Sequence, residues 1–217
     1  YTLLHSLHRA MGYGSCRVSA ALRLNDFVPA REAFLPRALA DSARRAFDAA
    51  FDAFYLGRIR LPMKHSGILT PGLYADFLAL DWQGFTPVTD LASTTPANGA
   101  PDCSAPEVLT DALAALHRRC PLPLSVTLHG VEDDIRVPYL FEHLRALSES
   151  ALPIERLFYG AFTDGFEWLD GQSVRRGIVS VDFDTQRRTP TDAYELLAAG
   201  DYSGAVAQFE KAGDGDN

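Results

Sequence analysis

The 217-residue sequence has few cysteines, no long apolar run and no cluster of basic residues. No uninterrupted apolar stretch reaches the roughly 20 residues that a membrane-spanning helix needs. The 20 Lys and Arg residues stand against 28 Asp and Glu residues, which gives a net charge of −8. A general nucleic-acid surface needs clustered Lys and Arg, so this charge argues against one. We therefore expect neither a membrane nor a nucleic acid as a partner.

The cysteines Cys16, Cys103 and Cys120 are odd in number and widely spaced, so they predict neither a disulfide framework nor a metal-ligand motif. Four histidines also follow no ligand spacing: His5, His8, His65 and His117. We expect buried or unreactive thiols in a reducing cytoplasm. We expect no metal ion and no cofactor.

The composition is that of a globular protein. Hydrophobic residues make up 47% of the chain and aromatic residues 11%, which is too much for wholesale disorder. The length suits about one ordinary domain with a real core. We place this domain at residues 1–200, and an added amphipathic helix with a frayed acidic tail at residues 201–217.

Short apolar runs alternate with segments of helical periodicity. Strands are expected at 16–24, 75–82, 122–128 and 156–162, with a short alternating strand at 177–184. Helices are expected at 2–11, at 37–56, from the capping box at Ser104, at 137–151, and from Thr191 to Gly200. This alternation implies right-handed βαβ units and a parallel sheet. Four such units make half of an eight-fold barrel or a small doubly wound sheet, and periodicity does not choose between them.

One segment favours the half-barrel over the doubly wound sheet. Residues 164–190 read DGFEWLDGQSVRRGIVSVDFDTQRRTP. The pattern lies in Asp164, Phe166, Glu167, Trp168, Gly171, Arg175, Gly177, Val181-Asp182, Thr185-Gln186 and Arg188-Thr189-Pro190. It resembles the C-terminal signature of glycoside hydrolase family 1, which includes the β-glucosidases and related retaining β-glycosidases. So many matches in register are a specific signal.

The resemblance extends towards the N-terminus with decreasing specificity. The segment LPLSVTLHGVEDDIRVPYLFEHLRAL, residues 122–147, is similar to strand seven and helix seven of the family. Two earlier segments, YADFLALDWQGFTPV and VSAALRLNDFVPA, resemble earlier strands. The likeness covers most of residues 1–197. It implies an α/β fold of the (β/α)8 TIM-barrel type, here strands five to eight with their helices, which is a half-barrel.

The resemblance also locates the position of the catalytic nucleophile. Retaining β-glycosidases use two carboxyl groups, one as acid/base and one as the nucleophile. The family's acid/base strand would lie before Tyr1, and its nucleophile, the Glu of Thr-Glu-Asn-Gly, corresponds to Leu128. Leucine cannot attack a sugar carbon, so we predict that the chain as given is catalytically inactive, although its relatives hydrolyse β-glucosidic bonds. We interpret Glu132-Asp133-Asp134 as a solvated acidic turn and not as a replacement.

The sugar-binding positions are partly retained. By resemblance, Glu167 offers its carboxylate and Trp168 its indole N–H to sugar hydroxyls, whereas the Trp that stacks on the sugar is replaced by Gly160. The alternative is that Glu167 and Trp168 are structural, with a packed indole and a carboxylate bonded to backbone or Arg. Three further residues are possible pocket lining: His129, Trp82 and Gln83.

Two functions therefore stay open. One is a family 1 hydrolase relative that has lost catalysis, and the other is a non-catalytic sugar-binding or scaffolding module that binds a β-glucoside or other sugar weakly. A half-barrel leaves two strand edges and an apolar inner face unpartnered. We therefore expect association, either with an N-terminal barrel half or with a second copy of the chain.

Overall fold

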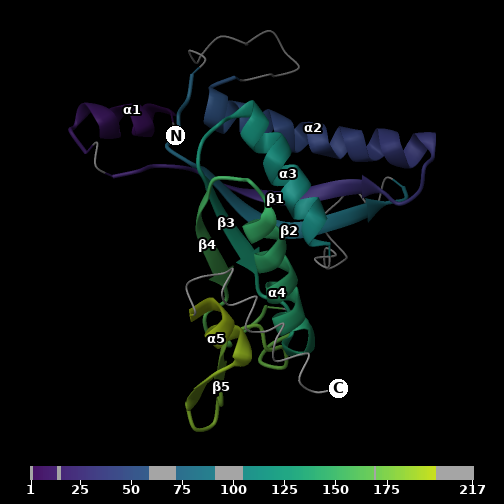
Figure 1. The fold of residues 1–217 in the computed structure, drawn as a ribbon, viewed down its shortest axis with the longest axis vertical. Coiled ribbons are helices and arrows are strands. Elements are labelled where there is room, and N and C mark those ends of the chain that lie inside the picture. The colour runs from purple at the N-terminus through teal and green to yellow at the C-terminus, as the bar shows by residue number, and fades with distance from the viewer. Residues whose placement is uncertain (1, 14–15, 59–71, 91–104, 169, 199–217) are drawn as a thin grey trace. The chain divides into compact units, whose positions relative to one another are not determined.

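The computed structural model describes residues 2–13, 16–58, 72–90, 105–168 and 170–198 (Figure 1). Within these ranges, helices and strands alternate along most of the chain. The elements are α1 (Thr2–Ala10), β1 (Ala21–Pro29), α2 (Phe34–Leu56), β2 (Leu78–Val88), α3 (Pro106–Arg119), β3 (Leu124–His129), α4 (Asp133–Glu149), β4 (Ile154–Gly160), β5 (Val179–Val181), β6 (Arg188–Pro190) and α5 (Asp192–Ala198). Ser104, Gly200 and the expected helix and tail at 201–217 lie outside the described residues.

Four of the strands form one sheet in the order β1-β2-β3-β4. The parallel β1–β2 register runs from Ala21 opposite Ala79 to Pro29 opposite Val88, with a shift between Leu24 and Asn25. Strands β5 and β6 form a separate antiparallel pair. The strand order follows the chain order with helices between the strands, which confirms the α/β prediction.

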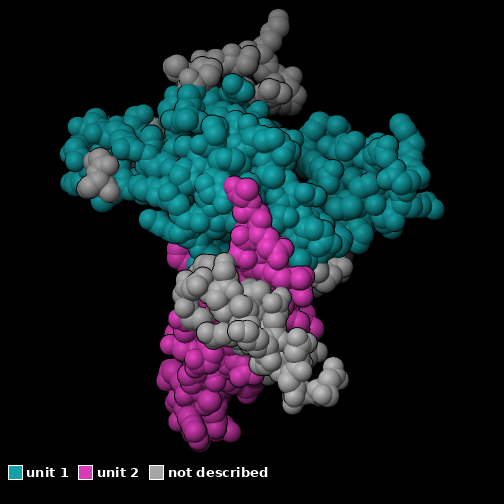
Figure 2. Space-filling view, in the orientation of Figure 1, with its two compact units in different colours: residues 1–127, 152–157 teal, residues 128–151, 158–217 magenta. Residues whose placement is uncertain are grey.

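Two compact units divide the chain (Figure 2). Unit 1 comprises residues 1–127 and 152–157, and unit 2 comprises residues 128–151 and 158–217. Each unit is described by itself below.

The core of unit 1 lies between α2 and the strands β1 and β2, with α3 also against β2. The buried Tyr55 of α2 ties the layers together, because its hydroxyl donates to the carbonyl of Ala20 at 2.5 Å and accepts the N–H of Ala79 at 3.0 Å. Helix α2 ends at Gly57, whose φ of 62° is left-handed and favours glycine.

Strand β1 lies later in the chain than the expected 16–24, and β2 continues past residue 82 to Val88. Asn25 and Asp26 do not end β1, because partners compensate their polar side chains. The amide of Asn25 donates to the hydroxyl of Thr86 at 3.0 Å. The Asp26 carboxylate accepts two hydrogen bonds from Arg44, at 2.7 and 2.9 Å.

Helix α4 begins at Asp133, four residues before the expected start at 137, and Pro138 lies inside it. The predicted acidic turn is therefore wrong, since Glu132 is the N-cap residue and the next two acidic residues begin the helix. Acidic residue types in a first helical turn are favoured by the helix dipole. The expected strand at 177–184 shortens to β5, because the chain turns at Asp182 towards β6.

In unit 2, α5 packs against α4 and β6. Its start agrees with the expected one, since α5 begins at Asp192 and the carbonyl of Thr191 accepts the N–H of Glu195 at 3.3 Å. None of the helices in the described part of the chain has both the length and the apolar character to cross a bilayer.

Candidate functional site

The end of β3 carries Leu128 and His129. The Leu128 side chain is 0% exposed, while His129 is half-buried. Gly130 follows, and its N–H donates to the carbonyl of Gly160. A Cβ at residue 130 would lie 2.8 Å from that oxygen, so the close approach of the two backbones requires glycine. The position that resembles the nucleophile is thus a core position with no side-chain surface open to solvent.

Tyr159 holds the backbone that follows β3. Its hydroxyl accepts the N–H of Val131 at 3.1 Å and donates to the carbonyl of Arg176 at 3.3 Å. Burial raises the pKa of the Tyr159 phenol, so it stays neutral and can serve in both roles. Glu132, three residues past the end of β3, is exposed and makes no side-chain cap hydrogen bond.

Glu167 and Trp168 lie together in a tight turn of unit 2. The backbones of Glu167 and Gly171 exchange two hydrogen bonds, of 2.7 and 2.8 Å. The Glu167 carboxylate lies 3.2 Å from a guanidinium nitrogen of Arg176. Trp168 is 93% exposed, and its ring meets that of Phe166 edge-on at a centroid distance of 6.4 Å. The ion pair agrees with the structural alternative, whereas the exposed indole is not a packed aromatic.

Trp82 and Gln83 belong to β2 in unit 1. Trp82 is fully buried, and its indole nitrogen has no hydrogen-bond partner within the described ranges. Gln83 is half-buried. Sequence reasoning treats both as possible pocket lining, and of the two Gln83 alone has exposed surface.

A buried carboxylate organises the signature segment. Asp164 accepts hydrogen bonds from the N–H of Gly177 at 2.9 Å and of Val181 at 3.2 Å, and from the Arg175 guanidinium at 3.1 Å. Burial alone would raise the pKa of Asp164, but these hydrogen bonds outweigh it and hold the pKa below its usual value. The ionised carboxylate therefore fixes the chain between the end of β4 and β5.

Two further buried polar residues, Arg136 and His143, lie in the same unit. The buried Arg136 donates to the carbonyl of Arg175 at 2.7 Å. The buried His143 has its Nδ1 at 2.8 Å from the carbonyl of Tyr139, one helical turn back. In the part of the chain that the structure describes, no group of three or more His, Cys, Asp or Glu residues is placed to hold a metal ion.

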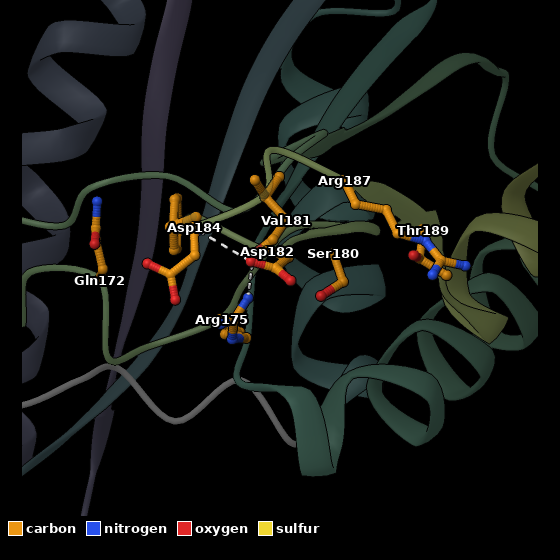
Figure 3. Close-up of a pocket in the computed structure, with 9 residues that line it drawn as sticks. Gln172, Arg175, Ser180, Val181, Asp182, Asp184, Arg187 and Thr189 are labelled. Carbon is orange, nitrogen blue, oxygen red and sulfur yellow. Dashed lines mark hydrogen bonds between the residues drawn. The ribbon is translucent and has the colours of Figure 1, made fainter.

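Sequence reasoning missed a polar pocket of about 510 Å³ around the β5–β6 hairpin (Figure 3). Its lining residues are Gln172, Arg175, Ser180, Val181, Asp182, Phe183, Asp184, Arg187 and Thr189. In Figure 3 Asp182, Asp184 and Ser180 lie near one another, with Arg175 below them in the view. Several of these residues belong to the signature motif, but the motif alone does not show that a hairpin curls them around one space.

The expectation of buried or unreactive thiols can be compared with two described cysteines. Cys120 is buried, but Cys16 is exposed. Both are free thiols. Cys103 lies outside the described residues.

Comparison with known proteins matches the chain to glycoside hydrolases. Residues 124–199 match the family model described as glycosyl hydrolase family 1. A β-glucosidase from Agrobacterium is 27% identical over an alignment that covers 91% of this chain and 54% of the relative. A 6-phospho-β-galactosidase from Streptococcus mutans is 38% identical over 76 residues, which cover 32% of this chain and 16% of that protein.

The solved structures agree on the fold. The β-glycosidase from Pyrococcus horikoshii superposes with a TM-score of 0.72 at 21% identity, over 94% of this chain and 51% of that one. The chain therefore spans about half the length of the β-glucosidase and β-glycosidase that it matches along most of its own length. Its β1–β4 sheet with helices is the second half of a (β/α)8 barrel, as predicted. The resemblance to glycosyl hydrolase family 1 is thus supported by a family-model match over residues 124–199 and by a β-glucosidase that aligns along most of the chain.

Proposed function

We propose that this chain is a catalytically inactive member of the β-glucosidase-like family. The observation that carries the proposal is Leu128, a fully buried leucine at the position of the attacking carboxylate. A hydrocarbon side chain can neither form the glycosyl-enzyme bond nor balance the positive charge that develops on the sugar.

The rate that would remain is very small. Loss of a covalent nucleophile costs on the order of 10⁴-fold or more in kcat, because the rest of the site cannot supply the missing bond. The nearest alternatives are poorly suited to the reaction. Glu132 is exposed at the start of α4, and His129 cannot act as a carboxylate nucleophile.

The test is nitrophenol release from a nitrophenyl β-glucoside by the chain, by Leu128→Glu and by the matched Leu128→Gln. The Gln variant has nearly the shape of Glu but cannot attack, and both place a polar group in a buried position. Circular dichroism establishes that each variant is folded. We expect no turnover by the natural chain or the Gln variant. Turnover by the natural chain that is lost on substitution of Glu132 or His129 overturns the proposal.

A second candidate is a non-catalytic module that binds a β-glucoside or other sugar. It is favoured by the exposed pair of Trp168 and Phe166 beside the Glu167 carboxylate, since aromatic faces pack on sugar C–H groups and carboxylates accept sugar hydroxyls. The sequence has two tryptophans, Trp82 and Trp168. Titration with glucose or cellobiose should change the fluorescence of Trp82→Phe, which keeps Trp168, and not that of Trp168→Phe. A flat response at high sugar concentration removes this candidate.

We also propose that the sheet is completed by association, with a polypeptide carrying the first barrel half or with a second copy of the chain. The support is the exposed apolar surface at β4, where Phe158 is 53% exposed, and just after it, where Phe162 is 61% exposed. Aromatic groups left in water on a sheet favour association. A monomeric, cooperatively folding chain in light scattering contradicts this proposal.

The cytoplasmic location is likewise a proposal. The free thiols of Cys16 and Cys120 suit a reducing compartment. An intramolecular disulfide in protein isolated without reductant would contradict it.

A further inference from the structure

The polar pocket around the β5–β6 hairpin has a rigid floor. One nitrogen of Arg175 donates to Asp164 at 3.1 Å and to the carbonyl of Val181 at 2.6 Å. The Arg175 guanidinium also lies over the ring of Phe183, 5.5 Å from its centroid. Asp164 is in turn fixed by two backbone N–H groups. Arg175 is therefore held from three sides, and its other N–H donors keep a fixed direction.

The acceptor beside it is equally fixed. One oxygen of the Asp182 carboxylate accepts the N–H groups of Asp184 and Thr185, each at 3.0 Å. Hydrogen bonds from the backbone and hydroxyl of Thr185 lower the pKa of Asp182 below its usual value, so the carboxylate is ionised at neutral pH. The Asp182 carboxylate also lines the pocket, where it can accept hydrogen bonds from a ligand.

The rim offers further groups that the protein does not use. In the part of the chain that the structure describes, the side chains of Gln172, Asp184 and Arg187 make no hydrogen bond or ion pair. The hydroxyls of Ser180 and Thr189 complete the lining. The pocket thus presents donors and acceptors together, some fixed by the fold and others free.

The charges of the lining balance. Two arginines, Arg175 and Arg187, stand against two aspartates, Asp182 and Asp184. A balanced lining has no net charge that would favour an anion or a cation. A ligand that gains from such a surface has to donate and accept hydrogen bonds at closely spaced positions without carrying charge.

We propose that this pocket binds a neutral polyhydroxylated molecule of mono- or disaccharide size. Each hydroxyl of such a molecule is both a donor and an acceptor, so neighbouring hydroxyls can meet an Arg N–H and an Asp oxygen together. The fixed floor reduces the ordering cost of binding. The pocket of about 510 Å³ has room for one or two sugar rings. This site is separate from Leu128 and from Trp168, and it does not depend on whether the chain hydrolyses glycosides.

The test is a titration of the isotopically labelled chain with glucose and with cellobiose, followed by backbone amide chemical shifts in NMR. We expect saturable shifts at residues 172–189. Arg187→Ala should weaken binding about five- to tenfold, since it removes one or two hydrogen bonds to a charged group. The matched control is Arg188→Ala, because Arg188 is also exposed but donates to the carbonyl of Gln186 and does not line the pocket. This control should bind as the natural chain does.

The same titrations with glycine and with inorganic phosphate test whether the pocket binds a zwitterion or an anion instead of a neutral sugar. Saturable shifts at residues 172–189 with either of these and none with the sugars overturn the proposal, as does an equal loss of affinity in the two arginine variants. Trp168→Ala separates this site from the second candidate function. Shifts at 172–189 that survive this substitution support the pocket, and shifts that vanish with it place the sugar at Trp168 and contradict the pocket.

Discussion

A carboxylate oxygen of Asp164 lies 3.1 Å from a guanidinium nitrogen of Arg175 and forms an ion pair whose acidic side chain is almost completely buried. The same carboxylate binds the N–H groups of Gly177 and Val181. The Asp164 carboxylate thereby connects its own segment with residues that lie 11 to 17 positions later in the family signature. The ion pair also forms part of the hairpin pocket, because Arg175 lines it.

Asp164→Asn tests this relationship through pH. The pKa of Asp164 is lowered in the folded state, so the carboxylate stabilises unit 2 above the unfolded pKa of about 4. That stabilisation is lost as the pH falls through the folded pKa. We expect Asp164→Asn to lower the free energy of unfolding at pH 7 by about 2 kcal/mol, because it weakens hydrogen bonds to a charged group. Urea unfolding between pH 7 and pH 3 measures this.

The variant should also show a flatter loss of stability below pH 4 than the natural chain. Asp170→Asn is the control, because Asp170 is exposed and lies 3.9 Å from its Arg176 partner. Equal pH profiles for natural chain and Asp164→Asn would show that the buried carboxylate contributes nothing.

Gly177→Ala should unfold unit 2. A Cβ at this position would overlap the backbone of Thr163 and Asp164, which cannot move without breaking the Asp164 hydrogen bonds. We expect a loss of more than about 3 kcal/mol, as for other severe overpacking. Gly165→Ala is the matched control, since a Cβ there meets nothing within 4 Å. Thermal unfolding followed by circular dichroism compares them, and equal midpoints contradict the close approach.

Tyr55→Phe tests how unit 1 is held together. The change leaves the N–H of Ala79 without its phenol partner in a buried setting, which should cost roughly 1–3 kcal/mol. Tyr13→Phe, at an exposed tyrosine stacked on His8, should cost almost nothing. Burial raises the pKa of Tyr55, so its stabilising effect should be lost as the pH rises above about 10. Denaturant unfolding from pH 7 to pH 11 should show a larger loss in the natural chain than in Tyr55→Phe, which keeps only the contribution of Tyr159.

Cys120 should react very slowly with thiol reagents. Burial raises its pKa to about 11, so the reactive thiolate is scarce at neutral pH and the sulfur is covered. In a chain with Cys16→Ser and Cys103→Ser, we expect labelling by iodoacetamide only after unfolding. In a chain with Cys103→Ser and Cys120→Ser, the exposed Cys16 should react readily in the folded state. Comparable rates for the two folded chains would refute the assigned burial.

The alternation of strands and helices could be predicted from the sequence, because it depends on local periodicity and on apolar strands. The end of β1 could not, because Asn25 and Asp26 are compatible with a strand only through Thr86 and Arg44, which are distant in sequence. The sequence predicts the start of α4 four residues too late, at residue 137 instead of Asp133, because of the residues in its first turn. Its first turn is polar and carries no apolar periodicity, so the acidic residues read as a loop.

For the candidate site, the sequence likewise predicts which residues matter but not all of their surroundings. The motif identifies Leu128, Glu167 and Trp168 by position, and Leu128 follows a run of apolar residues that already suggests burial. The exposure of Trp168 was not predictable, since it depends on the turn closed by Glu167 and Gly171. The hairpin pocket depends on tertiary contacts of Arg175 with Asp164, which no local pattern encodes.

The most direct test of the central claim is nitrophenol release from a nitrophenyl β-glucoside by the natural chain, with Leu128→Gln as control. The account predicts that the two proteins release nitrophenol at the same rate as buffer, because no carboxylate stands at the end of β3. Release above the buffer rate by the natural chain, lost in a Glu132→Gln or His129→Ala variant, would contradict it and would identify the group that replaces the nucleophile.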